Sequence, residues 1–211
     1  MFVASPCWKE CILTGFRVKA LDETTWPDFA RLVEKHNGVW GGCWCMSFHL
    51  EDGFGNRMVS QNRSEKERRV RDGRAHAALV YDGSLAVGWC QFGPTDELPR
   101  IKNKRAYLDG LTDLPDWRIT CFFVDRDYRD GGVASLALKG ALREISRLGG
   151  GSVESYPEEV KGRSVSASFL HNGTVSMFTR EGFKRSRRLG KNHWVVTKVV
   201  RKPSGKVPPR P

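Results

Sequence analysis

The stretch from Cys121 to Ala134, CFFVDRDYRDGGVA, has the residue types with which a chain can bind a charged ligand. An apolar run typical of a buried strand leads directly into Gly131 and Gly132, and a long helical pattern follows. The two glycines permit positive φ angles and carry no side chains, so several backbone N–H groups can converge on an anion. The N-terminus of the next helix adds about half a positive charge at the same point. The stretch therefore predicts a pyrophosphate site, although a tight strand–helix turn would need the same residues.

This stretch resembles the cofactor loop of the GCN5-related N-acetyltransferases (GNAT), which has Arg or Gln, two residues, Gly, one residue, then Gly or Ala. Arg129, Gly132 and Ala134 stand at those places. The resemblance implies that acetyl-CoA is the co-substrate, without a metal, and that its pyrophosphate lies on Arg129, Asp130, Gly131, Gly132, Val133 and Ala134. It also implies that the preceding strand splays from its parallel neighbour. Free backbone groups of Phe122, Phe123 and Val124 would then bond the pantetheine arm.

A second similarity to the same family lies about 40 residues downstream. The family often has Asn, Ala three residues later, Tyr three residues after that, and then Gly-Phe; this chain has Asn172, Val175, Phe178 and Gly182-Phe183. The resemblance implies that Asn172 and Phe178 also contact the cofactor. The family's Tyr commonly protonates the departing thiolate, and the phenyl ring of Phe178 has no proton to give.

The segment around Gly41–His49 (GGCWCMSFH) permits several interpretations. Cys43, Cys45 and His49 could ligate a metal, but their spacing is not a recurring zinc pattern, and we expect no metal. One cysteine could instead carry the acyl group with His49 as its base. The family layout favours an acceptor pocket formed by Trp40, Trp44, Cys45, Met46, Phe48 and His49. Plain packing of the same side chains is nearly as well supported.

A base beside the acyl carbonyl would help, because direct transfer requires a neutral amine. The central strand offers Arg118, Thr120 and Cys121 but no carboxylate. His49 and Glu154, on the next strand, are the catalytic candidates, and each residue type is more often structural than catalytic.

Hydrophobic periodicity around these motifs predicts an α/β protein. The strand at 118–125, the helix after it and the strand at 151–156 form a unit whose two strands should be parallel. Other strands are predicted at 16–21, on both sides of Asp82-Gly83-Ser84, and near 183–189 and 194–200; other helices are predicted after Thr24 or Thr25, at 64–72 and at 174–181. The resemblance, which covers 14–200, implies a GNAT-like mixed sheet with a splayed pair of parallel strands and flanking helices. We assign 1–13 to an extension and 201–211 to a basic, disordered tail.

The charge is distributed unevenly along the 211 residues. The net charge is +11, yet the stretch from Lys184 to Pro211 has ten basic and no acidic residues, and the rest has 25 basic and 24 acidic. Such a C-terminal region could contact nucleic acid or the cofactor's phosphates, or only keep the surface charged.

The six cysteines (7, 11, 43, 45, 90 and 121) are scattered, which favours reduced thiols. We find neither a secretion signal nor an apolar run of membrane-spanning length, so we expect a cytoplasmic protein without a membrane partner.

Two functional hypotheses follow. The first is an enzyme that transfers an acetyl group from acetyl-CoA to a primary amine by direct attack, with a small molecule favoured over a protein or an aminoacyl-tRNA. The second is a non-catalytic acyl-CoA sensor, or a nucleic-acid-associated protein, of the same fold. The Phe at 178 and the lack of a clear base favour the second hypothesis, whereas the intact cofactor loop fits both.

Overall fold

The computed structural model describes residues 15–53 and 55–203. The predicted extension at 1–13, with Cys7 and Cys11, and the tail from Ser204 onward lie outside the described residues. The elements in chain order are β1 (Phe16–Ala20), α1 (Trp26–Lys35), α2 (Val59–Arg71), β2 (His76–Asp82), β3 (Leu85–Pro94), α3 (Lys104–Leu108), β4 (Trp117–Val124), η1 (Arg126–Tyr128), α4 (Val133–Arg147), β5 (Gly151–Ser155), η2 (Ala167–Asn172), α5 (Val175–Arg180), β6 (Lys184–Leu189) and β7 (His193–Val200).

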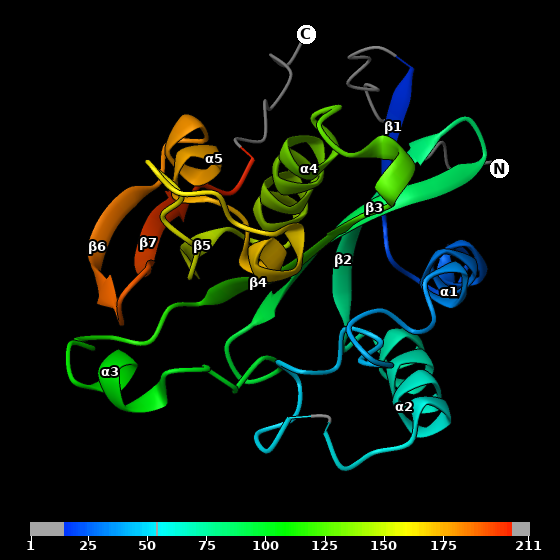
Figure 1. Cartoon of the computed structure of the whole chain (residues 1–211), viewed down its shortest axis with the longest axis horizontal. Helices are drawn as coiled ribbons and strands as arrows, with labels where there is room; N and C mark the ends of the chain where they lie inside the picture. Colours follow the sequence, from blue (N-terminus) through cyan, green and yellow to red (C-terminus); the bar gives the residue numbers. More distant parts are fainter. Residues whose placement is uncertain (1–14, 54, 204–211) are drawn as a thin grey trace, which may run out of the picture.

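The seven strands form one mixed sheet in the order β1-β2-β3-β4-β5-β7-β6 (Figure 1). Only β4 and β5 pair in parallel, and the other neighbours are antiparallel. The predicted strand–helix–strand unit and the hairpin at Asp82-Gly83-Ser84 are therefore confirmed. So is the fold class, an α/β sheet with one parallel pair and flanking helices.

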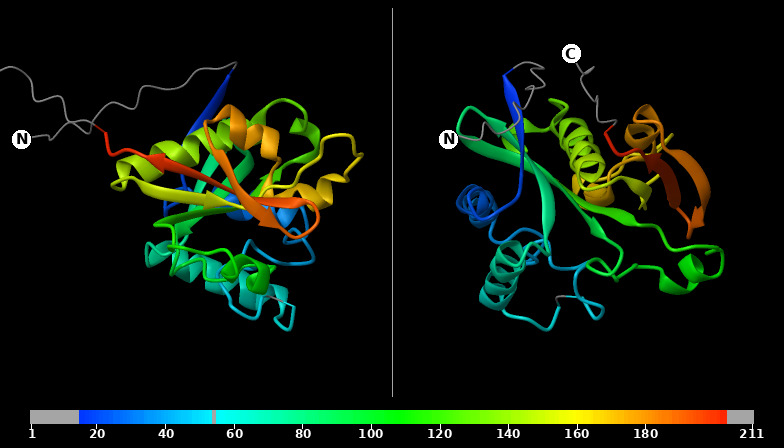
Figure 2. Two further views of the ribbon diagram at one scale, coloured as in Figure 1. Left: turned by 90° about the vertical axis from the view of Figure 1, so that its left-hand side faces the viewer. Right: turned by 180° about the vertical axis from the view of Figure 1, so that it is seen from behind.

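Helices cover both faces of the sheet (Figures 1 and 2). On one face, α1, the end of α2 and the segment between them pack against β2, β3 and β4. On the other face, α4 and α5 pack against the same central strands. Gly140 lets α4 lie close to the sheet, because a Cβ there would come within 2.5 Å of Val18 Cγ1 and 3.0 Å of Ala78 Cβ.

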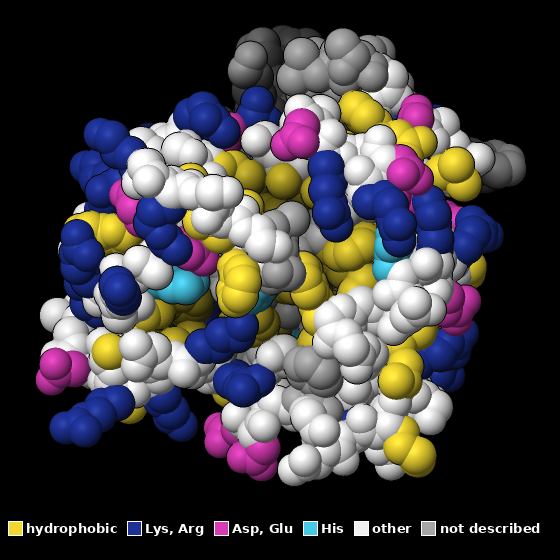
Figure 3. Space-filling view, in the orientation of Figure 1, with side chains coloured by type: hydrophobic (Ala, Val, Ile, Leu, Met, Phe, Trp, Pro, Cys, Tyr) yellow, Lys and Arg dark blue, Asp and Glu magenta, His cyan; other side chains and the backbone are white. Residues whose placement is uncertain are grey.

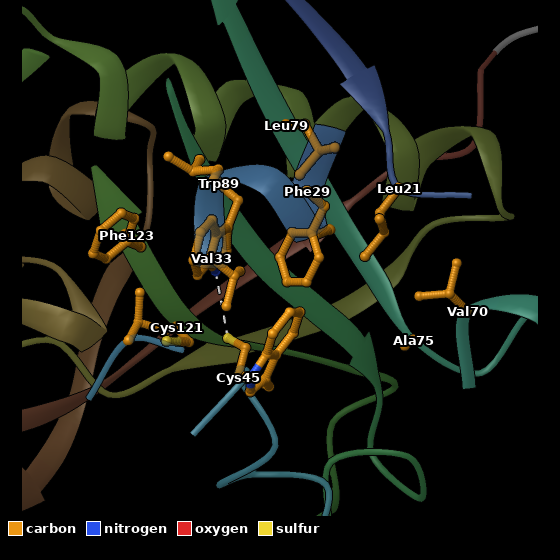
Figure 4. Packing of buried hydrophobic residues seen from close by; sticks show 14 of the residues in the cluster. Leu21, Phe29, Val33, Cys45, Val70, Ala75, Leu79, Trp89, Cys121 and Phe123 are labelled. Atoms are coloured by element: carbon orange, nitrogen blue, oxygen red, sulfur yellow. Dashed lines mark hydrogen bonds between the residues drawn. The ribbon is translucent and has the colours of Figure 1, made fainter. Parts of the chain in front are cut away.

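The segment between α1 and α2 is part of the core. Trp44, Cys45, Met46 and Phe48 are at most 3% exposed and pack with residues of the sheet and of α1. Figure 4 shows Cys45 beside Trp89 and Cys121. Trp89 Nε1 donates a hydrogen bond to Cys45 Sγ at 3.4 Å. This face of the sheet therefore uses a compact loop where a third helix would otherwise be needed to bury it.

Two helical elements differ from the prediction. Helix α2 begins at Val59, earlier than the predicted Ser64, because the Gln61 side chain accepts a hydrogen bond from Met58 N at 2.9 Å and Asn62 Nδ2 donates to Gly42 O at 2.9 Å. These two side-chain hydrogen bonds favour a helix N-terminus at Val59, which the pattern of charged residues alone does not predict. The short helix α3 lies in a stretch for which the sequence analysis predicts no element, and its one buried residue is Tyr107.

The four described cysteines, Cys43, Cys45, Cys90 and Cys121, are buried free thiols. In the part of the chain that the structure describes, no helix has the length and hydropathy to cross a membrane.

Candidate functional site

A gap opens in the sheet where β4 and β5 part. The two strands pair only from Trp117 to Ile119, and β4 then continues to Val124 without a partner on that side among the described residues. Side chains take over the strand contacts at this point: Ser155 Oγ donates to Ile119 O at 2.8 Å, and Asn172 Nδ2 donates to Thr120 O at 2.6 Å. We call Ser155 and Asn172 the side-chain wedge.

The backbone of β4 faces this gap at alternate residues. Asp125 N donates to Val87 O of β3 at 2.9 Å, and the antiparallel register pairs Phe123 with Trp89. Because successive residues of a strand point their N–H and C=O groups to opposite sides, those of Phe122 and Val124 point toward the gap. The prediction therefore fits Phe122 and Val124, whereas the backbone of Phe123 faces β3 and its ring stacks on Trp89 at 4.7 Å.

After β4 the chain forms an exposed turn that leads into α4. Residues 129–132 are exposed, and Gly132, with φ 79°, is the N-cap of the 15-residue helix. The sequence permits positive φ at Gly131 and Gly132, and in the structure it occurs at Gly132 and at Asp130 (φ 61°). Asp tolerates this region better than most residues, because its short polar side chain can bond locally. The first N–H groups of α4, including those of Val133 and Ala134, have no acceptor within the helix and can bind an anion.

Asp125 fixes the start of this turn against α1. Its carboxylate is buried, accepts a hydrogen bond from Lys35 Nζ at 2.7 Å and lies 3.3 Å from His36 Nε2. It also accepts a bond from Asp127 N at 3.3 Å, which begins η1. The turn is therefore held between α1 and α4.

Phe178 lies behind the gap, and Asn172 lies at its edge. Phe178 is fully buried, with its ring centroid 5.9 Å from that of Phe122 and 4.9 Å from that of Phe183. Asn172 is 3% exposed and belongs to the side-chain wedge. Phe178 thus supports Phe122 from behind, and Asn172 lies at the gap itself.

His49 belongs to a buried chain of polar side chains. His49 Nδ1 lies 2.9 Å from Glu97 O, and Lys66 Nζ donates to His49 Nε2 at 3.1 Å and to Gln91 Oε1 at 2.9 Å. Gln91 Nε2 in turn donates to Thr120 Oγ1 at 3.1 Å. Burial, with the charge of Lys66 next, holds the pKa of His49 well below its ordinary value, and burial also lowers the pKa of Lys66. Both ring nitrogens of His49 are engaged, which favours a structural role.

Glu154 is also buried and engaged. Its Oε2 accepts hydrogen bonds from Tyr107 at 2.8 Å and from Tyr156 at 3.2 Å, and its Oε1 lies 3.9 Å from Arg187 Nη1. These contacts favour a structural role for Glu154 beneath α3 over a role as an accessible base.

The predicted acceptor pocket is mostly core. Trp44, Cys45, Met46 and His49 are buried, and Trp40 is partly buried, with its ring centroid 6.4 Å from that of Phe123. Phe48 is the member of this set that lines a cavity adjoining the gap. In the described part of the chain, no three His, Cys, Asp or Glu side chains are arranged to hold a metal ion.

That cavity has a volume of about 240 Å³ and is formed by four parts of the chain besides Phe48. It is lined by Ile101, Lys102, Asn103, Tyr156, Asn172, Leu189, Gly190, Lys191, Asn192 and His193. Asn172 places it beside the gap. Sequence reasoning did not find Lys102 or His193, because they come from segments far apart in the chain. A turn rich in Gly and Asn before a lone His, at 190–193, was the available signal.

His193 lies in the wall of this cavity and is partly exposed. Its Nε2 lies 3.7 Å from Glu158 Oε2, and Glu158 also accepts a bond from Arg163 Nη2 at 3.0 Å. Burial lowers the pKa of His193 below its ordinary 6.5, so the neutral imidazole predominates at neutral pH.

A second cavity, of about 640 Å³, lies between α1, β3 and η1. Its charged lining includes the carboxylates of Asp28, Asp125 and Asp127 beside Arg31 and Lys35. These carboxylates would repel phosphate groups, so the exposed turn before α4 suits a pyrophosphate better.

No protein-family model and no curated protein sequence matches the chain. Solved structures of acetyltransferases share the fold. A histone acetyltransferase HPA2-related acetyltransferase from Corynebacterium glutamicum is 12% identical with a TM-score of 0.52, over 90% of this chain and 99% of that one. An N-acetyltransferase from Staphylococcus aureus is 11% identical with a TM-score of 0.50, over 89% and 100%. The acetyltransferase yncA from Salmonella typhimurium, solved with its cofactor acetyl-CoA, is 11% identical with a TM-score of 0.50, over 89% and 95%.

Proposed function

We propose that this chain, which has the fold of the GCN5-related N-acetyltransferases, transfers an acetyl group from acetyl-CoA to the amine of a small acceptor. One observation carries the proposal: the unpaired end of β4 leads into an exposed glycine turn at the N-terminus of a long helix. An extended arm with a pyrophosphate at its end has the shape and charge for these two neighbouring features.

In this proposal the pantetheine arm lies along β4 and the pyrophosphate lies on the turn. Amide groups of the arm would bond the N–H and C=O groups of Phe122 and Val124, as an added strand does. The pyrophosphate would accept hydrogen bonds from the turn and the first N–H groups of α4, and Arg129 would add a charge. The thioester would then lie near the wedge, beside the 240 Å³ cavity.

The acceptor would occupy that cavity and attack the thioester directly. Its neutral amine adds to the thioester carbonyl, which forms the N–C bond and a tetrahedral oxyanion. The carbonyl then re-forms as the C–S bond breaks and its electron pair leaves on sulfur. A backbone N–H of Phe122 or Val124 would stabilise the oxyanion. We assign the proton of the amine to the neutral imidazole of His193, directly or through one water, in place of the buried His49 and Glu154.

The Phe at position 178 fits this chemistry. A thiol has an ordinary pKa of about 8.5, so coenzyme A can leave as a thiolate and take a proton from water afterwards. An acid at this position would therefore be useful but is not required. No cysteine is needed either, because a thioester is already activated, and Cys45 is only 2% exposed.

Two measurements test the proposal. Calorimetry with acetyl-CoA and with desulfo-coenzyme A should show binding of both, and a free-thiol assay should show release of coenzyme A only when an amine is present. A folded protein that binds neither compound would refute the assignment. Binding without turnover on a broad amine panel would instead support the non-catalytic acyl-CoA sensor.

A further inference from the structure

The 240 Å³ cavity carries positive charge. Its basic lining residues are Lys102, Lys191 and His193, and none of its eleven lining residues is Asp or Glu. Lys102 comes from the segment before α3, Lys191 from the turn between β6 and β7, and His193 from the start of β7. On the face shown in Figure 3, Lys and Arg side chains also gather on the β6 side of the central hollow.

Among the described residues, no carboxylate forms an ion pair with Lys102 or Lys191. Lys102 Nζ lies 2.7 Å from His171 Nε2, a ring nitrogen and not an anion. Two carboxylates lie just behind lining residues: Glu158, matched by Arg163 at 3.0 Å and by His193 at 3.7 Å, and Glu154, which accepts a hydrogen bond from Tyr156 at 3.2 Å.

The surroundings of Lys102 disfavour its charge as long as no anion is present. Although the residue as a whole is exposed, its ammonium lies against the protein, and this loss of hydration lowers the pKa of Lys102. A carboxylate or phosphate in the cavity would reverse that cost, because an opposite charge within about 4–6 Å favours the charged form. A neutral amine would leave the pKa of Lys102 low.

The size of the cavity limits the acceptor. Its volume is below the range of about 300–1,000 Å³ that is typical of drug-sized ligands. One wall, at Asn172, adjoins β4 through the 2.6 Å bond to Thr120 O, so the reacting amine must lie on that side. Lys102 and Lys191 border the rest of the cavity.

We infer that, within the proposed acetyl transfer, the acceptor is a compact amine that also carries an anionic group, a carboxylate or a phosphate, bound by Lys102 and Lys191. This inference rests on the proposed function and adds the substrate class. The charge complementarity acts on the binding of the acceptor, so it should appear in KM more than in kcat.

The test compares acceptors that differ by one anionic group. Three matched sets serve: lysine against cadaverine, phenylalanine against phenethylamine and phenylalaninamide, and phosphoethanolamine against ethanolamine. For at least one set, kcat/KM should be about tenfold higher for the anionic member, which corresponds to about 1.4 kcal/mol. The first two sets report a carboxylate, and the third reports a phosphate.

Variants then assign the preference to the two lysines. Lys102→Gln and Lys191→Gln should each raise KM for the anionic acceptor, leave KM for its uncharged partner unchanged, and bring the ratio toward one when combined. Lys184→Gln is the matched control, since Lys184 is exposed at the far end of β6 and should leave the ratio intact.

The inference is overturned if uncharged amines are acetylated as well as the anionic ones, if no member of the three sets is acetylated, or if the double variant keeps the preference. Calorimetry with acetyl-CoA is run on the same samples. If the wild-type protein does not bind acetyl-CoA, the proposed function is refuted. If it binds acetyl-CoA but does not prefer anionic acceptors, only this inference is refuted.

Discussion

Replacing Gly132 with Asp should weaken acetyl-CoA binding at least about 30-fold. Gly132 is exposed, caps α4 and has φ 79°, and no atom lies within 4 Å of a Cβ built there. The substitution therefore adds no steric clash within the protein. It places a carboxylate where the pyrophosphate must approach the first N–H groups of the helix.

The magnitude follows from the charges. Two unit charges about 6 Å apart interact by about 2.8 kcal/mol at an effective dielectric constant of about 20. Water and salt reduce this at an exposed turn, and about 2 kcal/mol is a reasonable remainder, equal to about 30-fold in affinity. The effect should diminish as the salt concentration rises.

Two controls separate charge from backbone strain. Gly132→Asn has nearly the same shape and the same left-handed backbone cost but no charge, so it should lose much less affinity. Gly73→Asp adds a carboxylate at another exposed glycine with φ 66° and open space around Cβ, at the end of α2, and should bind acetyl-CoA normally. Calorimetry at two salt concentrations measures all three. Equal losses for the Asp and Asn variants at 132, or unchanged binding by folded Gly132→Asp, would contradict the pyrophosphate assignment.

Four further predictions concern the gap, the cavity and the tail. Phe178→Tyr should lower the unfolding free energy by about 1–3 kcal/mol in urea titrations, because it buries an unpartnered hydroxyl, and should not raise kcat; a faster enzyme would mean that an acid was missing. His193→Asn should lower kcat/KM about 100-fold. Because the pKa of His193 lies below 6.5, the wild-type rate should fall as the pH drops through that lower value. If the variant shows the same fall in rate at acidic pH, His193 is not the base. Cys45→Ser should keep most turnover, and acetyl-CoA alone should add no acetyl group (about 42 Da) to the enzyme; an adduct that chases onto amine would overturn direct transfer. If the C-terminal region binds nucleic acid, deletion of 201–211 should reduce the salt dependence of binding, and no affinity even at low salt would leave these residues a surface role.

The strand–turn–helix unit that we propose for the cofactor could be predicted from the sequence because its signals are local. The apolar run, the glycines and the helix pattern are contiguous from Cys121 to Ala134, and each specifies one step of the strand–turn–helix unit. The structure has positive φ at Asp130 and not at Gly131, and residue preference alone could not decide between the two.

The cavity that we propose for the acceptor could not be predicted, for two physical reasons. The aromatic segment between α1 and α2 takes positive φ at Val39 and Trp40, which are unusual for such side chains, and so folds into the core. The cavity itself is lined by Phe48, Lys102 and His193, which come from distant segments with no common spacing.

Part of the C-terminal charge excess has a structural explanation. Lys184, Arg185, Arg187 and Arg188 lie on the edge strand β6, where basic side chains discourage pairing with another chain.

The side-chain wedge determines what an incoming ligand must break. Because Ser155 and Asn172 already satisfy the carbonyls of Ile119 and Thr120, a ligand that lies along Phe122 and Val124 displaces solvent and no strand. Each ladder bond that it would otherwise rupture represents a net cost of about 0.5–1.5 kcal/mol. Association should therefore be a single concentration-dependent step without a slow opening phase. The amides of Phe122 and Val124 should exchange with deuterium quickly in the free protein and slowly in the complex, in contrast to the permanently paired amide of Phe123.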